Sequence, residues 1–338
     1  MAGEFGFEPD AERAARLSAE IADRFAASLR IVADRLADQP GLDRATLERL
    51  ADETAAARRL DPTRSALFHR AVAAFRAGDR PAAARLVGRL GEFPQRPTAM
   101  PPQIADLDDA DLGSGMATIF TELVDIEPEN RLDFVAAGPA TKAQVKAYLA
   151  RSAEIMRADA PALAAEIEQL TTLVVVADQG PQRLITAHGV SAFEVWGAVC
   201  LQGPSIDSAM DFLESFTHEC AHLLLYALAV GGPVVENPRD QRIWSPFRGQ
   251  FRTVDGVFHA TFVLARMIYV LDAALAGTTL TAEERDEAER RRAENYETFL
   301  ESLSFLREHA IFTERGRPLI DGAEAYVRRS PVAAAVPA

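Results

Sequence analysis

Apolar positions in the first hundred residues recur at the spacing of an α-helix. Between residues 11 and 36 they fall three or four positions apart, at Leu17, Ile21, Phe25, Leu29 and Val32. That spacing places the apolar side chains on one face of a helix. The pattern predicts a long amphipathic helix over residues 11–36, with Pro40-Gly41 as its break.

Helix-start residues divide the rest of this region. Asp43 is expected to cap a second helix, and Asp61-Pro62 is a start signal for a third. Together with Gly78-Asp79 and Pro81, these signals predict helices over residues 43–57, 61–75 and 81–90. Four prolines between Phe93 and Gln103 then predict a linker. The next stretch, Asp106 to Asp111, is acidic and expected to be exposed.

The spacing changes in the middle of the chain. Helical patterns over residues 142–157 and 161–170 are followed by Thr171 to Val176, a β-branched run that is typical of a buried strand. Ile185 to His188 and Val195 to Leu201 are shorter strand candidates. We expect a small sheet of about three strands.

Helices return after the strands, over residues 208–229, 257–275 and 281–309. The sequence therefore predicts a mainly α fold, with a small β-sheet beside the helix over residues 208–229. We expect a helical N-terminal subdomain over residues 1–100, a second helical domain over 101–330, and a disordered tail over 331–338.

Composition narrows the class of protein. The 338 residues carry a formal net charge of -14 and are 48% hydrophobic, which suffices for a buried core. No run of Lys and Arg indicates nucleic-acid binding. No apolar run reaches the roughly 18 residues of a membrane helix. Residues 1–10 lack the features of a signal peptide. The two cysteines, Cys200 and Cys220, form no CxxC pattern. We expect a cytoplasmic protein with no nucleic-acid or membrane partner.

The segment His218-Glu219-Cys220-Ala221-His222 is an HExxH motif in a chain of only six histidines. It lies within the stretch 208–229, which lacks Pro and Gly and should be helical throughout. Four residues make about one helical turn, so His218 and His222 lie one above the other. Both imidazoles can then reach one metal ion. In hydrolytic zinc enzymes the Glu of this motif is a general base.

A metal held by two histidines needs a third protein ligand. The helix over 257–275 contains no Glu, but His259 lies in its first turn. Glu236, in the preceding loop, is the second choice because a mobile loop is less well preorganised. We therefore predict that His218, His222 and His259 bind the metal. The remaining histidines, His69, His188 and His309, are expected to be dispensable.

The loop between these helices is rich in arginine and aromatic residues. Residues 237–252 contain four arginines, one Trp and two phenylalanines. Arginine binds a carboxylate through two parallel hydrogen bonds. Arg248 and Arg252 come just before His259, where the chain must return to the metal. They are the candidate anchors for an anionic ligand.

Together these residues resemble a known family. His218-Glu219-x-x-His222, Ser245-Pro246-Phe247-Arg248, Arg252 and Gly256-Val257-Phe258-His259 are similar to the HExxH-motif family of ribosomal-peptide-modifying enzymes. The resemblance covers roughly residues 171–271. It implies an iron(II)- and 2-oxoglutarate-dependent peptide β-hydroxylase, a dioxygenase whose partner is a precursor peptide. Under it, the three histidines would hold iron. We infer in addition, from the position of the arginines just before His259, that Arg248 or Arg252 would bind the carboxylate of 2-oxoglutarate. Three histidines depart from the common triad of two histidines and one carboxylate.

Two other functions stay open. A zinc metallopeptidase would use Glu219 as its catalytic base, and imidazole ligands accept zinc as well as iron. A non-catalytic protein would instead bind peptides or proteins through its N-terminal helices. The absence of the usual third-ligand patterns of metallopeptidases favours the hydroxylase.

Overall fold

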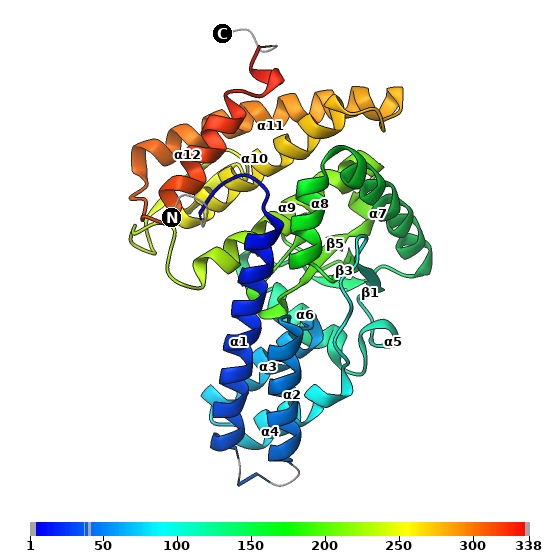
Figure 1. Cartoon of the computed structure of the whole chain (residues 1–338), viewed down its shortest axis with the longest axis vertical. Helices are drawn as coiled ribbons and strands as arrows, with labels where there is room; N and C mark the ends of the chain where they lie inside the picture. The colour runs from blue at the N-terminus through cyan, green and yellow to red at the C-terminus, as the bar shows by residue number, and fades with distance from the viewer. Residues whose placement is uncertain (1–4, 37, 40–41, 335–338) are drawn as a thin grey trace. The chain divides into compact units, whose positions relative to one another are not determined.

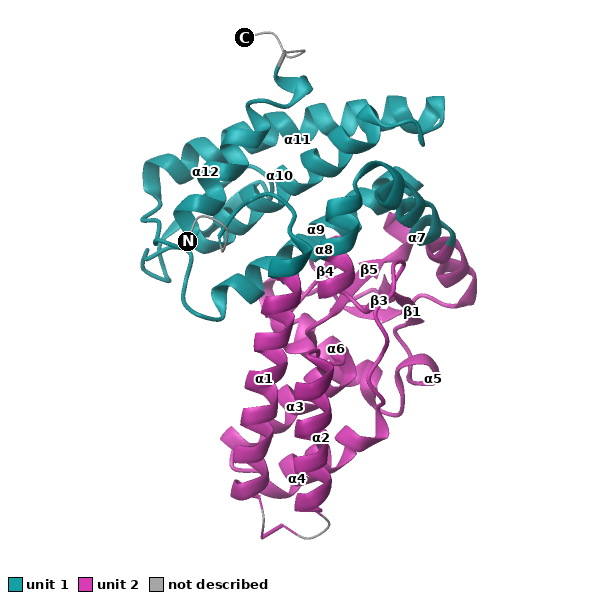
Figure 2. Ribbon diagram, viewed as in Figure 1, with its two compact units in different colours: residues 1–13, 147–166, 207–338 teal, residues 14–146, 167–206 magenta. Residues whose placement is uncertain are grey.

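The computed structural model describes residues 5–36, 38–39 and 42–334 (Figure 1). The chain forms two compact units (Figure 2). Unit 1 comprises residues 1–13, 147–166 and 207–338, and unit 2 comprises residues 14–146 and 167–206. Neither unit is one continuous stretch. The Pro-rich segment after Phe93 lies inside unit 2, and so does the expected division between residues 100 and 101.

Helices form the N-terminal part of unit 2. The first of them, α1 (Ala11–Arg35), has its first three residues in unit 1. The others are α2 (Arg44–Ala57), α3 (Pro62–Arg76), α4 (Arg80–Gly88) and the 3-10 helix η1 (Arg89–Glu92). The side chain of Asp43 accepts a hydrogen bond from a backbone N–H at the start of α2, and Asp61 does so for α3. These contacts confirm both predicted caps. Pro40-Gly41 lies outside the described residues.

A five-stranded sheet forms the other part of unit 2. Its strands are β1 (Gln103–Asp106), β2 (Phe134–Ala136), β3 (Leu173–Gln179), β4 (Gly189–Val190) and β5 (Ala198–Gln202). The central strand β3 is parallel to β1 and β5 and antiparallel to β2, and β4 is antiparallel to β5. Val174, Val175 and Val176 are completely buried. The predicted strands near residues 171–176 and 195–201 are confirmed.

Short elements connect these strands, and two helices pass from one unit into the other. The connecting elements are α5 (Asp109–Leu112), α6 (Met116–Val124), η2 (Pro128–Asn130), η3 (Phe193–Val195) and η4 (Gly203–Ser205). The helices shared by both units are α7 (Pro139–Asp159) and α8 (Pro161–Leu170). Both were predicted, α7 with shorter bounds.

Three sequence predictions are wrong. Ile185 to His188 is not a strand, because pairing with β5 begins only at Gly189. Asp106 is buried, since its carboxylate accepts hydrogen bonds from the backbone N–H groups of Ala137 and Gly138. In the predicted disordered tail, Pro331–Ala334 forms the 3-10 helix η5, and residues 335–338 lie outside the described residues.

Unit 1 is built around one apolar helix. Its elements are α9 (Ala209–Ala229), β6 (Arg242–Ser245), β7 (Gln250–Thr253), α10 (Val254–Ala276), α11 (Ala282–His309) and α12 (Gly316–Val327). Helix α10 packs against α9, α11 and α12. In Figure 1, α10, α11 and α12 lie side by side. Helix α12 and the β6–β7 hairpin were not predicted.

By length and composition, the 23-residue helix α10 could cross a membrane. The sequence prediction did not single it out, because it looked for an uninterrupted apolar run. In the structure, 78% of the relevant stretch is buried. That burial is expected of the central helix of a folded unit. The observed fold is mainly α with a small mixed sheet, as the sequence predicted.

Candidate metal centre

Helix α9 carries the HExxH motif in its middle. The hydroxyl of Ser208 accepts a hydrogen bond from the backbone N–H of Asp211 at 3.0 Å and so caps the helix. No Pro or Gly interrupts the following 21 residues. His218 and Glu219 are buried, and His222 is partly exposed. The motif is therefore held on a regular, capped helix.

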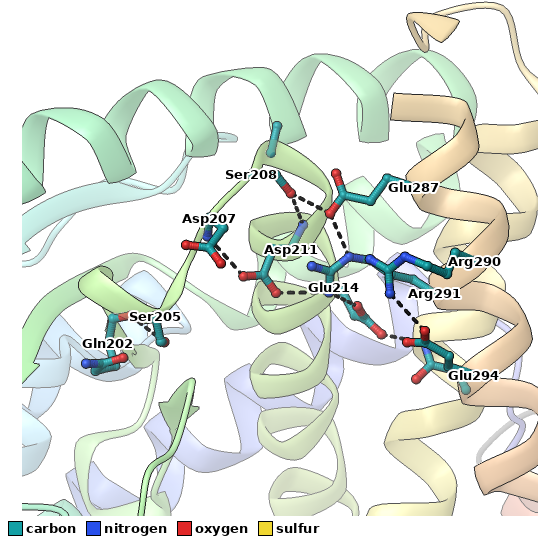
Figure 3. A network of polar contacts seen from close by, with 12 residues as sticks. Gln202, Ser205, Asp207, Ser208, Asp211, Glu214, Glu287, Arg290, Arg291 and Glu294 are labelled. Atoms are coloured by element: carbon teal, nitrogen blue, oxygen red, sulfur yellow. Dashed lines mark hydrogen bonds and ion pairs between the residues drawn. The ribbon is translucent and has the colours of Figure 1, made fainter. Parts of the chain in front are cut away.

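An arginine from α11 binds the first turns of α9 (Figure 3). The Nη1 atom of Arg291 lies 3.0 Å from Asp211 Oδ1 and 2.8 Å from Glu214 Oε2, and its Nε atom lies 2.8 Å from Glu287 Oε1. The Arg291 side chain is only 19% exposed, so these hydrogen bonds are partly screened from water. They fix the N-terminal half of α9 against α11.

Glu214 is the buried member of this network and lies one turn before His218. Burial raises the pKa of its carboxyl, while hydrogen bonds from Asn295 and Arg291 oppose that rise. A buried carboxylate is costly unless its oxygens are paired. Its pairing with two α11 residues therefore links the position of the motif to α11.

The two motif histidines approach each other closely. The Nε2 atom of His222 lies 3.1 Å from the Nε2 atom of His218, and the ring centroids are 4.8 Å apart. Two nitrogens that bind one metal at about 2.0–2.1 Å are themselves about 2.9–3.4 Å apart. The two Nε2 atoms therefore fit adjacent positions on one metal ion.

His259 lies beside this pair, in the second turn of α10. Thr253 caps α10 by accepting the backbone N–H of Gly256, which sets the start of the helix. The Nδ1 atom of His259 lies 3.3 Å from Nδ1 of His222, and the two rings stack at 5.5 Å. Glu236 is exposed, and its backbone N–H donates to Ile311. The structure therefore brings His259 to the motif.

The three rings do not each direct one nitrogen toward a single point where a metal ion could lie. His222 faces His218 with Nε2 and His259 with Nδ1, and one metal cannot use both nitrogens of one imidazole. Accordingly, no group of three potential ligands suited to a metal is present within residues 5–36, 38–39 and 42–334. Two of the three imidazoles fit a metal as they stand. The third would have to rotate about its side-chain bonds.

Electrostatics favour the neutral form of these histidines. Burial lowers the pKa of His222 well below its usual range, and the neighbouring His218, His259 and Arg248 lower it further. Burial also lowers the pKa of His259, while Asp255 acts in the opposite direction. A neutral imidazole is the form that binds a metal. At neutral pH, His222 and His259 therefore carry no charge that would repel a cation.

The turn between β6 and β7 covers the cluster. The ring of Phe247 stacks on that of His218, with centroids 5.4 Å apart and planes inclined by 24°. The guanidinium of Arg248 lies 5.4 Å from the Phe247 ring and is close enough to His222 to lower its pKa. Arg252 follows on β7, three residues before the exposed Asp255. Of the two candidate anchors, Arg248 is the one whose charge lowers the pKa of a motif histidine, His222.

Two residues at the cluster were not singled out from the sequence. Met267 on α10 places its Sδ atom 3.4 Å from Nδ1 of His218. A thioether is a weak acceptor, so this contact favours a proton on Nδ1 and leaves Nε2 for a metal. Tyr226, one turn after His222, has its ring 6.1 Å from His222 and 5.7 Å from His259. The spacing His222-x-x-x-Tyr226 was the available signal for the tyrosine.

Glu219 points close to the same cluster. Its Oε1 atom lies 3.9 Å from Nε2 of His218, and the residue is 4% exposed. Of the other histidines, His69 and His188 belong to unit 2, and His309 is the last residue of α11. A carboxylate therefore borders the side of His218 that would face a metal.

Comparison of the chain with protein-family models and with curated proteins finds no match.

Proposed function

We propose that this protein is an iron(II)- and 2-oxoglutarate-dependent hydroxylase that acts on a residue of a ribosomally made peptide. The main support is the approach of His218, His222 and His259, which are brought together from two helices. The position of Arg248 beside this cluster adds a cation for a dicarboxylate. The family resemblance then favours hydroxylation over hydrolysis.

In this proposal the three histidines hold the iron. The bound iron, with 2-oxoglutarate and oxygen, would supply the oxidation of a C–H bond to C–OH, with release of succinate and carbon dioxide. Phe247 and Met267 contact His218 from apolar or weakly polar groups, which keeps water away from that ring. Because the pKa of His222 is lowered, one of its two ring nitrogens carries a free lone pair at neutral pH.

Arg248 would bind the distal carboxylate of 2-oxoglutarate, with Arg252 as the alternative. A guanidinium offers two parallel N–H donors that match the two oxygens of a carboxylate. Its positive charge also disfavours a proton on His222, so one side chain would serve both the anion and the metal ligand. Tyr226 would border the same space from α9.

A zinc metallopeptidase is the second candidate, and one observation favours it. Glu219 lies 3.9 Å from the Nε2 atom of His218, where a carboxylate could take a proton from an attacking water. In the hydroxylase, the same carboxylate would instead accept a hydrogen bond near the metal ligands. The two candidates therefore assign Glu219 different roles.

One experiment separates the candidates. The protein is purified without oxygen, its metal content is measured, and it is incubated with Fe(II), 2-oxoglutarate, oxygen and a candidate precursor peptide. Succinate release with a mass gain of one oxygen supports the hydroxylase. Peptide cleavage with zinc, in the absence of oxygen and 2-oxoglutarate, supports the peptidase. If neither reaction occurs and no metal is retained, the non-catalytic peptide-binding alternative is favoured.

The anchor is tested by Arg248→Lys, with Arg252→Lys as the matched variant. Lysine keeps the charge but loses the two parallel donors, so we expect 2-oxoglutarate to bind about tenfold more weakly to the true anchor variant. Metal content should stay unchanged. Calorimetric titration of 2-oxoglutarate into metal-loaded protein measures this difference. Equal affinities in wild type and both variants would exclude these two arginines as anchors.

A further inference from the structure

The β6–β7 hairpin has one face packed inside unit 1 and one face exposed. Ile243 and Ser245 alternate along β6 and are buried at 4% and 1% exposure. Alternate residues of a strand point to opposite faces. Arg242 and Trp244 therefore belong to the other face, together with Phe251, which lies directly opposite Trp244 on β7.

This outer face combines an aromatic pair, the exposed Phe251 and the half-buried Trp244, with a cation. Phe251 is 67% exposed, and its ring packs edge-on against Trp244 at 5.5 Å. Arg242 is exposed, and its Nη1 atom donates to the backbone oxygen of Arg239 at 2.9 Å. Aromatic residues and arginine are enriched at interaction surfaces relative to the rest of a protein surface. The face has the composition of an interaction surface.

The hairpin is also a local positive region on an acidic chain. Residues 239–252 contain four arginines and one aspartate, whereas the whole chain has 36 basic and 50 acidic residues. Within the residues that the structure describes, neither Arg239 nor Arg242 forms an ion pair with a carboxylate. Their guanidinium groups therefore favour an anionic partner.

Strand β7 has an edge that can accept another strand. Among the described residues, β6 and β7 form a sheet of two strands; both contact α10, which directly follows β7, and β6 also contacts α11. In such a ladder, about half of the N–H and C=O groups of β7 point away from β6. An extended peptide could pair with them by adding a third strand.

The position of β7 connects this edge to the histidine cluster. The turn before it carries Phe247, which stacks on His218. The strand leads directly into α10, and His259 follows six residues after Thr253. A peptide strand placed along β7 would therefore run between two segments that contact the cluster.

We propose that the β6–β7 hairpin binds an acidic peptide segment in the extended conformation, along the free edge of β7. The peptide backbone pairs with β7, apolar side chains pack on Trp244 and Phe251, and acidic side chains face Arg239 and Arg242. This inference rests on the proposed function, since it gives the peptide substrate a chemical class and a docking surface. Nucleic acid fits less well, because two unpaired arginines stand against a net charge of -14.

Binding is tested with the full-length, metal-free protein by fluorescence anisotropy. The probes are labelled ten-residue peptides: alternating Glu and Val, alternating Lys and Val, and alternating Glu and Pro. We expect the Glu-Val peptide to bind at least tenfold more tightly than either of the others, because Pro cannot donate to a strand ladder. The affinity should also fall as salt rises. Equal binding of the Lys-Val or Glu-Pro peptide would overturn the proposal.

Substitutions at two exposed residues test whether the peptide binds on the outer face of the β6–β7 hairpin. We expect Phe251→Ser and Arg242→Glu each to weaken Glu-Val binding by roughly five- to tenfold. The control is Arg24→Glu, which breaks an exposed pair with Glu20 in unit 2. Unchanged circular dichroism and melting temperature show that the hairpin variants remain folded. If both bind as tightly as the control, the surface lies elsewhere and the proposal fails.

The outcomes separate this inference from the proposed function. Binding is measured without iron or 2-oxoglutarate, so it does not depend on the reaction. Selective binding of the Glu-Val peptide together with an absence of succinate release supports the surface and opposes the hydroxylase. Hydroxylation of a precursor peptide that is unaffected by Phe251→Ser and Arg242→Glu supports the hydroxylase and overturns the surface. Tighter binding of a twelve-nucleotide oligothymidine than of the Glu-Val peptide would also overturn it.

Discussion

At the scale of single residues, the cluster brings three imidazoles close together, and burial favours the neutral form of two of them, His222 and His259. The nitrogen atoms of His222 lie 3.1 Å from His218 and 3.3 Å from His259. Protonation of His222 would place a charge beside the two other rings and Arg248. At His222, burial and neighbouring charges therefore act in the same direction and favour the neutral imidazole.

We expect His222→Ala to abolish metal retention, because it removes the one imidazole that lies beside both others. The helix should persist, since alanine favours helix. Metal per chain is measured by mass spectrometry after gel filtration. His309→Ala, at the exposed end of α11, is the matched control and should keep its metal. A His222→Ala protein with full metal content would contradict the proposed ligand set.

The His222 pKa predicts how the metal-free protein responds to acid. A pKa that is lower in the folded protein means that the unfolded chain takes up a proton first. The stability contributed by neutral His222 is therefore complete above about pH 6.5 and is lost as pH falls below it. His259 and His69 act in the same direction.

We therefore expect the free energy of unfolding to fall from pH 7.5 to pH 5 less steeply in His222→Gln than in wild type. Chelator-treated protein is unfolded in urea at each pH, with His309→Gln as the control. Identical pH profiles for wild type and His222→Gln would show that His222 does not have a lowered pKa.

At the scale of elements, the motif helix is positioned by α11. Arg291 binds Asp211 and Glu214 on α9, and Glu214 lies one turn before His218. Thus α11, which carries none of the candidate ligands, holds the first turns of the motif helix in place. Helix α10 completes the arrangement by packing against both α9 and α11.

We expect Arg291→Met to destabilise the protein by about 3–5 kcal/mol, since it leaves two buried carboxylates without their cation. Metal affinity should also fall at temperatures where the variant remains folded. The control Arg290→Met removes an exposed pair with Glu294 and should cost less than about 1 kcal/mol. Urea unfolding and metal titration measure the two effects. Equal losses in both variants would exclude the positioning role of Arg291.

At the scale of the whole molecule, unit 1 is made of three separate segments of the chain. One buried cluster of three charged side chains joins these segments. Glu166 on α8 lies 2.9 Å from Arg13 and 3.0 Å from Arg266 on α10, and all three side chains are at most 3% exposed. Arg266 also lies over the rings of Phe7 and Phe262. The carboxylate of Glu166 therefore joins Arg13 and Arg266, which are far apart in sequence.

We expect Glu166→Ala to be severely destabilising, by about 3–5 kcal/mol or more, because it leaves two buried guanidinium groups without an anion. Thermal unfolding followed by circular dichroism measures the loss. Glu20→Ala, which breaks an exposed pair with Arg24, is the control and should be near neutral. A small effect of Glu166→Ala would mean that the triad does not hold these segments together.

Much of the helical fold could be predicted from the sequence because its signals are local. The apolar spacing and the caps Asp43, Asp61 and Ser208 act within a few residues of each other. The same locality identified the HExxH motif, because His218 and His222 are one turn apart on any helix. His259 was chosen by elimination on the following helix, and the structure brings it beside His222.

Only the tertiary structure decided the rest, because it depends on residues that are distant in sequence. The sequence could not show that Met267 contacts His218, that Phe247 stacks on it, or that Arg291 binds α9. Local spacing likewise failed at Ile185 to His188, where strand pairing with β5 begins one residue later. The motif is set by helical periodicity, whereas its surroundings are set by packing between elements, which no local pattern encodes.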